Sequence, residues 1–300
     1  MTIDIMMPFW GDVSLLKIAV TSVLEQDDAA WRLVVIDDRY PGTEHTRFLA
    51  GIDDPRVVTV VNDVNLGVSG NFQRSIDLAT ADHMVIMGCD DVLRPNYVAR
   101  MSALIADHPT AAYFQPGVRV IDDLGRPSLP LADRVKEWYR PSRSSVSLLA
   151  GEALAVSLLR GNWTYFPSIC WRTDRLRALG FRSDFQVVLD LALQFDIAAS
   201  GGSMAVDGVD SFEYRRHAGS VSSVTAVDGR RFEEERRFFR EAAERSHALG
   251  WKRAERVARH HVSSRLSALT RIPSAIRLGE PAGVRELLAH AAARSTRVPH

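Results

Sequence analysis

Short apolar runs alternate with segments of helical spacing through the first 120 residues, and this alternation limits the folds open to the chain. The runs with the length and boundaries of buried strands are residues 3–8, 33–36, 57–61 and 84–87. The segments predicted as helices are residues 13–24, 69–79 and 96–106. Strands and helices in this order build βαβ units, so the sequence predicts an α/β fold with a doubly wound, mostly parallel sheet.

Local signals set some element boundaries. Pro8 is expected to stop the first strand, and Asp12 is expected to cap the helix that follows. In the second half we expect a strand at 118–122, a long loop over 126–147 and helical structure from about residue 230. The shorter elements predicted between them are a helix at 148–159, a strand at 169–171 and a helix at 187–199.

Composition excludes several classes of protein. The formal net charge is zero, which gives no sign of nucleic-acid binding. Cys89 and Cys170 are the only cysteines, so a disulfide framework is excluded and a cytoplasmic setting is expected. The sequence shows no signal peptide and no window near the roughly 20 apolar residues that span a bilayer. Any membrane role is therefore expected to be peripheral, at the inner face.

Carboxylates follow two of the predicted strands. Asp37 and Asp38 end one run, and Asp90 and Asp91 follow another. Parallel strands place their carboxyl ends at one edge of the sheet, which is where open α/β sheets bind ligands. Adjacent carboxylates repel each other unless a cation or hydrogen bonds offset their charge. The pattern therefore indicates a divalent metal site beside a phosphate, although solvated turns also favour Asp.

Four motifs occur in a recognisable order and spacing: Pro8-Phe9-Trp10, Val35-Ile36-Asp37-Asp38, Asn65-Leu66-Gly67 followed by Asn71, and Asp90-Asp91-Val92-Leu93-Arg94-Pro95. Together they resemble family 2 glycosyltransferases of the GT-A fold. Leu189-Asp190 and residues 214–222 extend the resemblance over about residues 1–222. It implies a catalytic domain at 1–222, with a nucleotide-binding half (1–120) and an acceptor-binding half (121–222), followed by a helical extension (223–300).

The resemblance implies an inverting transfer of a sugar from a nucleoside-diphosphate donor to an acceptor hydroxyl. Asp38 would accept hydrogen bonds from the base, with Asp37 nearby. The other residues expected around the donor nucleoside are Pro8, Phe9, Trp10, Asn65, Gly67 and Asn71. Core packing is the alternative for Trp10, and N-capping is the alternative for Asn65 or Asn71.

The resemblance also implies a metal site. Asp90 and His217 would bind Mg²⁺ or Mn²⁺, Asp91 would bind a sugar hydroxyl or a metal-bound water, and Arg216 would contact phosphates. Gly88 departs from the family pattern, because a carboxylate is common at that position. Cys89 suits these metals poorly and is expected to be a small buried filler.

Asp190 is the candidate general base for the acceptor hydroxyl, with Asp196 and Asp184 as rivals. An exposed helix carboxylate is the plain alternative. The aromatic segment 161–165 is expected beside the acceptor, although a hydrophobic core turn remains an alternative.

Two other functions stay open at this point. A sugar nucleotidyltransferase would carry a Gly-rich basic loop after its first strand, and Pro8-Phe9-Trp10-Gly11-Asp12 is aromatic and acidic instead. A non-catalytic nucleotide-sugar binding protein is favoured by Gly88 and Leu189. The C-terminal helices are candidates for a homodimer interface, an acceptor-site cover or a peripheral membrane contact, the last ranking below packing or dimerisation.

Overall fold

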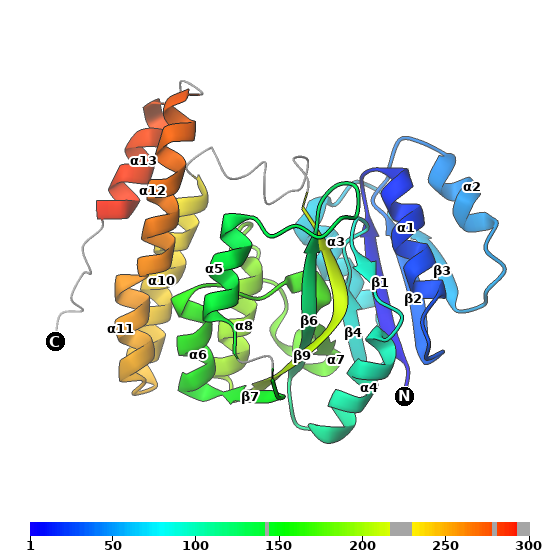
Figure 1. Cartoon of the computed structure of the whole chain (residues 1–300), viewed down its shortest axis with the longest axis horizontal. Coiled ribbons are helices and arrows are strands. Elements are labelled where there is room, and N and C mark those ends of the chain that lie inside the picture. The colour runs from blue at the N-terminus through cyan, green and yellow to red at the C-terminus, as the bar shows by residue number, and fades with distance from the viewer. Residues whose placement is uncertain (142–143, 217–229, 278–280, 293–300) are drawn as a thin grey trace.

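The computed structural model describes residues 1–141, 144–216, 230–277 and 281–292. Helices cover a twisted central sheet, and a group of C-terminal helices stands at the end of the molecule opposite β3 (Figure 1). The strands are β1 (Ile3–Phe9), β2 (Trp31–Asp37), β3 (Val57–Val61), β4 (His83–Ile86), β5 (Val92–Leu93), β6 (Tyr113–Ile121), β7 (Ser147–Ala150), β8 (Cys170–Arg172) and β9 (Ser203–Arg215).

The first helices are α1 (Val13–Leu24), α2 (Glu44–Ala50), α3 (Gly67–Leu78) and α4 (Tyr97–Asp107). The second half contains α5 (Leu131–Tyr139), α6 (Gly151–Arg160), the 3₁₀ turn η1 (Phe166–Ser168), α7 (Thr173–Leu179) and α8 (Leu189–Ala199). The C-terminal helices are α10 (Arg230–Ala248), α11 (Lys252–His260), α12 (Val262–Arg277) and α13 (Pro281–Ala292).

The strand order is β3-β2-β1-β4-β8-β6-β9-β5, with β7 paired to β9. The ladders of β1 with β2 and β4, of β2 with β3, and of β6 with β9 are parallel. The short strand β8 runs antiparallel between β4 and β6 and joins the two parallel regions. The α/β prediction is confirmed, because the longer ladders are parallel and helices pack on both faces.

The prediction that Pro8 stops the first strand is wrong. β1 continues to Phe9, and Pro8 lies opposite Ile36 of β2. The carbonyl of Met6 accepts a hydrogen bond from Met87, on the β4 side, and Pro8 faces the same side two residues later. Because β4 ends at Ile86, the missing N–H of Pro8 costs no ladder bond.

Helix α1 begins and ends where the sequence predicts. The Asp12 carboxylate accepts a hydrogen bond from the Ser14 amide at 2.7 Å, which confirms the predicted N-cap.

One prediction for the second half is wrong: the segment 126–147 is not one long loop, because α5 occupies its centre. The expected helix at 148–159 is present as α6, but it begins later, because β7 occupies Ser147–Ala150 and α6 starts at Gly151 with a φ of +51°. Helix α5 gave no apolar signal because its buried residue is the charged Asp133, and Arg140, which follows its last residue, is buried as well, whereas Leu131 and Trp138 face solvent.

Two large apolar clusters pack in the α/β domain, and a smaller one holds the C-terminal helices together. Phe238 of α10 makes edge-on contacts with Phe195 of α8 and with Phe185, which lies in the segment before α8. The predicted domain boundary at residue 222 lies outside the described residues.

Candidate active site

Three neighbouring strands bring the predicted site residues to one edge of the sheet. β1 lies between β2 and β4, and Phe9 is in register with Asp37 at the ends of their strands. Asp90 and Asp91 follow the end of β4. The expected convergence of the strand ends is therefore present in the fold.

Asp38 is buried, and its carboxylate accepts three hydrogen bonds from protein donors. Its Oδ1 accepts hydrogen bonds from Asn62 Nδ2 and from the Leu66 amide, both at 2.8 Å, and its Oδ2 accepts from the Gly67 amide at 2.9 Å. Gly67 has a φ of +68° at the first residue of α3, a conformation that favours glycine. Asp38 thus fixes the loop that leads into α3.

Asn65 and Asn71 support the same loop in different ways. Asn65 Nδ2 donates to the Asp38 carbonyl at 2.9 Å, and its Oδ1 accepts from the Gly67 amide at 3.1 Å, which is a capping contact. Asn71 is buried and its Nδ2 donates to the Ile36 carbonyl at 3.3 Å, so it ties α3 to β2.

Asp37 borders a cavity of about 390 Å³ beside the sheet edge. Its Oδ1 accepts a hydrogen bond from the Tyr40 amide, and its Oδ2 lies 2.8 Å from Nε2 of the buried His45. Arg39 has a φ of +64°, which turns the chain sharply after the two aspartates. The other residues that line the cavity are Arg39, Tyr40, Pro41, Gly42, His45, Thr46 and Val61.

The aromatic residues after β1 have different environments. Trp10 is 53 % exposed and meets the Tyr40 ring edge-on at 5.7 Å, so the core-packing alternative for it is wrong. Phe9 has no exposed surface and packs against the rings of Tyr40 and His45 at 5.1 Å. Sequence reasoning missed Tyr40 and His45, because a lone aromatic residue and a lone His carry no spacing signal.

The carboxylates of Asp90 and Asp91 converge on the backbone of Gly88. A Cβ atom at Gly88 would lie 2.6 Å from Asp91 Oδ2 and 2.8 Å from Asp90 Oδ1. The space that a side chain would fill is therefore taken by the two carboxylates. With Asp90 and Asp91 in these positions, the carboxylate that is common at position 88 in the family would have no room.

Burial, and then the neighbouring charge of Asp90, raises the pKa of Asp91 well above its usual range. Arg215 braces this turn: its amide donates to Asp91 Oδ1 at 2.9 Å and its Nε to the Asp90 carbonyl at 2.7 Å. A divalent cation would offset the repulsion between the two carboxylates, so the pair fits a hard metal ion.

The rest of the predicted metal site is less complete. Within the described residues, no group of three His, Cys, Asp or Glu side chains is placed to hold a metal ion. His217 lies outside those residues. Burial raises the pKa of the Cys89 thiol to about 12, which supports the role of an uncharged filler.

Asp190 lies in the first turn of α8, and its Oδ2 accepts a hydrogen bond from Asn162 Nδ2 at 3.1 Å. Thr164 donates to Asn162 Oδ1 at 2.7 Å and accepts from Gln194 at 3.0 Å, so a polar chain orients the aspartate. The two rivals are held elsewhere. Asp196 pairs with Arg245 of α10, and Asp184 pairs with Arg182 at 2.9 Å.

Helix α5 places further charges near Asp190. Arg216 forms two hydrogen bonds with the fully buried Asp133, at 2.9 and 3.1 Å. Lys136 donates to the Thr164 carbonyl and lies 4.2 Å from the Tyr165 ring centroid. Burial and the charge of Arg216 lower the pKa of Lys136 to about 8, although Asp133 and Asp190 act in the opposite direction. Sequence reasoning missed Asp133 and Lys136 because it placed them in a loop.

The aromatic segment 161–165 packs inward. Trp163 and Tyr165 are buried, so the core-turn alternative describes both side chains. Asn162 and Thr164 are the members of this segment that reach Asp190 through hydrogen bonds. The expectation of aromatic faces beside the acceptor is therefore wrong for these two rings.

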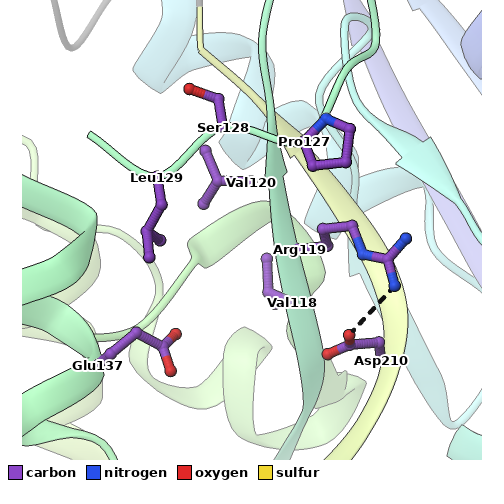
Figure 2. Close-up of a pocket in the computed structure, with 8 residues that line it drawn as sticks. All are labelled: Val118, Arg119, Val120, Pro127, Ser128, Leu129, Glu137 and Asp210. Carbon is purple, nitrogen blue, oxygen red and sulfur yellow. Dashed lines mark ion pairs between the residues drawn. The ribbon is translucent and has the colours of Figure 1, made fainter.

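A second cavity, of about 430 Å³, lies between α5 and the β6–β9 ladder (Figure 2). Its wall combines apolar side chains, among them Val118, Val120 and Leu129, with the ion pair of Arg119 and Asp210 at 3.6 Å. Glu137 of α5 faces it from the opposite side.

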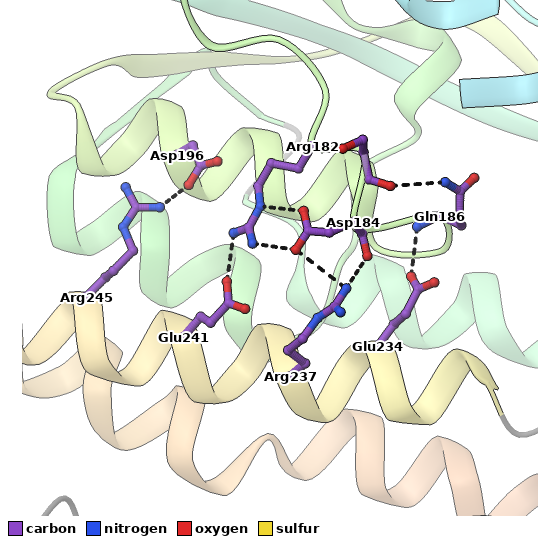
Figure 3. A network of polar contacts seen from close by, with 9 residues as sticks. Arg182, Asp184, Gln186, Asp196, Glu234, Arg237, Glu241 and Arg245 are labelled. Carbon is purple, nitrogen blue, oxygen red and sulfur yellow. Dashed lines mark hydrogen bonds and ion pairs between the residues drawn. The ribbon is translucent and has the colours of Figure 1, made fainter. Parts of the chain in front are cut away.

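Helix α10 is joined to the segment before α8 by a network of hydrogen bonds and ion pairs (Figure 3). Glu234 Oε2 accepts hydrogen bonds from the amides of Gln186 and Val187, and the Gln186 side chain accepts from Ser69 of α3 at 2.8 Å. Arg182 pairs with Glu241, also of α10, at 2.8 Å. The C-terminal helices therefore hold the entry to the helix that carries Asp190.

No helix among the described residues has the length and apolar character to cross a membrane.

Residues 4–155 match the family model described as glycosyl transferase family 2. Among curated proteins, the chain is 31 % identical over 105 residues to the putative colanic acid biosynthesis glycosyl transferase WcaA of Escherichia coli (strain K12), which covers 35 % of this chain and 37 % of that protein. It is 26 % identical over 211 residues to the succinoglycan biosynthesis protein ExoO of Rhizobium meliloti (strain 1021), covering 70 % of this chain and 59 % of that one. The chain thus spans less than two thirds of either relative.

Solved structures of similar fold include S. aureus TarS residues 1–349 in complex with UDP-GlcNAc. The TM-score is 0.64 at 12 % identity, covering 99 % of this chain and 93 % of that one. The same TarS fragment in complex with UDP gives a TM-score of 0.59. At this identity the likeness shows a shared fold, the GT-A architecture expected from the sequence motifs.

Proposed function

The chain belongs to glycosyl transferase family 2, and from that premise we propose that it is a metal-dependent, inverting glycosyltransferase. In this proposal it moves a sugar from a nucleoside-diphosphate donor to an acceptor hydroxyl. The observation that carries the proposal is the convergence of Asp90 and Asp91 on Gly88, on the same sheet edge as the Asp37 cavity. Two carboxylates beside a cavity suit a cation-bound diphosphate.

The donor nucleoside would lie at the cavity lined by Asp37 and Tyr40. The exposed ring of Trp10, which meets Tyr40 edge-on, and the half-buried Pro8 would be further contacts for it. Asp38 enters this proposal as the anchor of the loop formed by Asn65, Gly67 and Asn71, because three protein donors already engage its carboxylate. Asp37 is then the carboxylate better placed to meet the base. The complex of TarS with UDP-GlcNAc supports UDP as the first nucleotide to test.

Mg²⁺ or Mn²⁺ would be held by Asp90, with Asp91 beside it and His217 as a further candidate ligand. Bound there, the cation would neutralise negative charge on the leaving diphosphate. Asp91 would hold a sugar hydroxyl or a metal-bound water, and Arg215 fixes the turn that presents both carboxylates. Arg216 is tied to Asp133, so its contact with phosphates would use donors outside that pair.

Asp190 would take the proton from the acceptor hydroxyl as that oxygen attacks the anomeric carbon and the diphosphate leaves from the opposite face. The Asn162 hydrogen bond orients one oxygen of the carboxylate, and the first turn of α8 stabilises its negative charge. Residues 1–222 would carry this chemistry, with the donor on 1–120 and the acceptor on 121–222, and the helices from α10 onward would support it.

The test is turnover of UDP-, GDP- and dTDP-sugars by the full chain with Mn²⁺, measured as release of the nucleoside diphosphate. Asp90→Asn and excess EDTA are each expected to abolish turnover, and Asp190→Asn is expected to reduce it by at least about 10²-fold. If EDTA leaves turnover intact, the metal role fails. If Asp190→Asn leaves it intact, the assignment of the base fails.

Calorimetric titration with UDP separates the two aspartates after β2. Asp37→Asn is expected to weaken UDP binding and to lower stability less than Asp38→Asn does, because Asp37 accepts one hydrogen bond from a backbone amide and Asp38 accepts two. Asp38→Asn is expected to lower the unfolding temperature, because it replaces one of two buried acceptor oxygens with an NH2 group that would face a protein donor. If UDP binds but no nucleotide-sugar donor is turned over, the non-catalytic alternative is favoured. Gly88 and Leu189 are the residues that support that alternative.

A further inference from the structure

Helix α12 presents a continuous apolar stripe to solvent. Val262, Leu266, Leu269 and Ile276 are 57, 55, 46 and 63 % exposed, and Pro273 between them is also exposed. These positions recur every three or four residues, so they fall within about 80° of one another around the helix. Single exposed apolar residues are common on protein surfaces, but an ordered row along one helix marks a contact surface.

The stripe is separate from the face by which α12 packs on its own chain. That inner face carries Ala268, Ile272 and Ala275, which pack with Phe232 of α10 and Leu287 of α13. The outer stripe is thus not needed to hold the C-terminal helices together.

The exposed charged side chains of α11 and α12 are all basic. Helix α12 has no acidic residue. Its exposed Arg277 and half-buried Arg265 flank the stripe, whereas Arg271 lies on the opposite side of the helix. The exposed side chains of the preceding helix α11 are all basic, namely Lys252, Arg253, Arg256 and His260. Both helices lie along α10 at the end of the molecule opposite β3 (Figure 1).

A second copy of this chain is a poor occupant for this surface. The stripe is roughly 20 Å long and about 10 Å wide, or about 200 Å², whereas a stable interface buries about 800 Å² per partner. Pro273 lies inside the row and interrupts the helical hydrogen bonding that a straight two-helix seam needs. Pairing two such faces would also bring arginines together.

We propose that the outer face of α12 binds the surface of an anionic phospholipid membrane. Val262, Leu266, Leu269 and Ile276 would enter the boundary between headgroups and acyl chains, while the flanking arginines and the basic face of α11 contact headgroup phosphates. This proposal does not depend on the glycosyltransferase assignment, since it rests on the C-terminal helices alone.

Co-sedimentation of the full chain with vesicles tests the proposal. We expect binding to an equal mixture of phosphatidylcholine and phosphatidylglycerol at about 0.1 M salt, and weak binding to phosphatidylcholine alone or at about 1 M salt. Leu266→Glu or Leu269→Glu is expected to lower the partition coefficient by at least about tenfold. Arg277→Gln, which leaves the apolar row intact, is expected to lower it about fivefold.

Leu249→Glu is the matched control, because Leu249 is 44 % exposed at the end of α10 but lies outside the stripe. It is expected to bind vesicles like the unchanged chain, and circular dichroism with thermal unfolding checks that each variant is folded. The proposal is overturned if the unchanged chain does not bind anionic vesicles, or if folded Leu266→Glu and Leu269→Glu bind like the control. The proposal is also overturned if the unchanged chain forms a dimer without lipid and Leu266→Glu dissociates that dimer, since a second copy would then cover the stripe.

Discussion

The Oε2 atom of Glu234 accepts a hydrogen bond from the backbone amide of Val187 at 2.8 Å. The two residues come from different parts of the fold: Glu234 lies on α10, and Val187 lies two residues before the helix that carries Asp190. The same oxygen also holds the Gln186 amide at 2.9 Å. A helix outside the α/β domain thus fixes the backbone that leads to the proposed base.

Glu234→Gln is expected to lower kcat about tenfold while the KM for the donor changes little, because a neutral amide holds the two backbone donors less strongly and Asp190 loses its orientation. Steady-state kinetics against donor concentration measure this split. Glu233→Gln changes the exposed neighbouring residue and is expected to leave kcat intact. A rise in KM with an unchanged kcat would contradict a positioning role for Glu234.

Asp190→Asn is expected to reduce kcat by about 10²–10⁴-fold, the usual contribution of a general base, with the fold unchanged. Asp196→Asn on the same helix removes only the surface ion pair with Arg245 and is expected to keep most of the activity. A comparable loss of kcat in the two variants would mean that activity depends on the integrity of α8 and not on the Asp190 carboxylate.

Gly88→Ala is expected to weaken Mn²⁺ binding by about tenfold or more and to cost about 1–3 kcal/mol of stability. The added methyl would press on Asp91 Oδ2 and Asp90 Oδ1 at 2.6 and 2.8 Å, which forces the carboxylates apart. Calorimetric Mn²⁺ titration and thermal unfolding measure both effects. The control is Gly11→Ala, whose added methyl would meet only Cys89 Sγ at 3.9 Å. Unchanged Mn²⁺ affinity in Gly88→Ala would argue against a cation at these carboxylates.

The stability of the C-terminal helices is expected to fall at mildly acidic pH. Burial lowers the pKa of His290 to about 4 from its usual 6.5, and it lowers the pKa of His261, whose ring lies 5.3 Å away. Between these pH values the unfolded chain binds more protons, so stability is complete above about pH 6.5 and is lost as the pH falls toward about 4.

Urea unfolding followed by circular dichroism at several pH values measures this slope. His290→Gln is expected to reduce the slope of unfolding free energy against pH. His260→Gln, a change at an exposed position on α11, is expected to leave that slope unchanged. The charges of Glu235, Arg236 and Arg265 also shift the pKa of His290, and salt screens such charges. The variants are therefore compared at one salt concentration. Equal slopes in both variants would contradict the assignment.

Much of the first half of the fold follows from the sequence alone. Helix α1 has the predicted ends, β3 coincides with the run at 57–61, and the carboxyl ends of β1, β2 and β4 meet at one edge as expected. Helix α1 buries its apolar side chains at helical spacing, and β1, β2 and β4 are nearly continuous apolar runs buried on both faces, which are the signals that sequence analysis detects.

Helix α5 shows where that signal fails. Asp133 is its one buried residue and Lys136 is half-buried, while Leu131 and Trp138 are exposed, so it lacks the apolar stripe of a core helix. The roles of Asp37 and Asp38 show a second limit. Adjacent aspartates look alike in a sequence, and only tertiary contacts separate the one that anchors α3 from the one that borders the cavity.

The three-residue strand β8 has a consequence for how this chain is made. It covers the edge of β4, yet it lies at residues 170–172, far beyond β4 in the chain. During synthesis from the N-terminus, the parallel half of the sheet therefore emerges from the ribosome with the edge of β4 open until β8 has been made. A fragment that ends at residue 155, the limit of the family match, would keep that edge exposed and would be prone to aggregate.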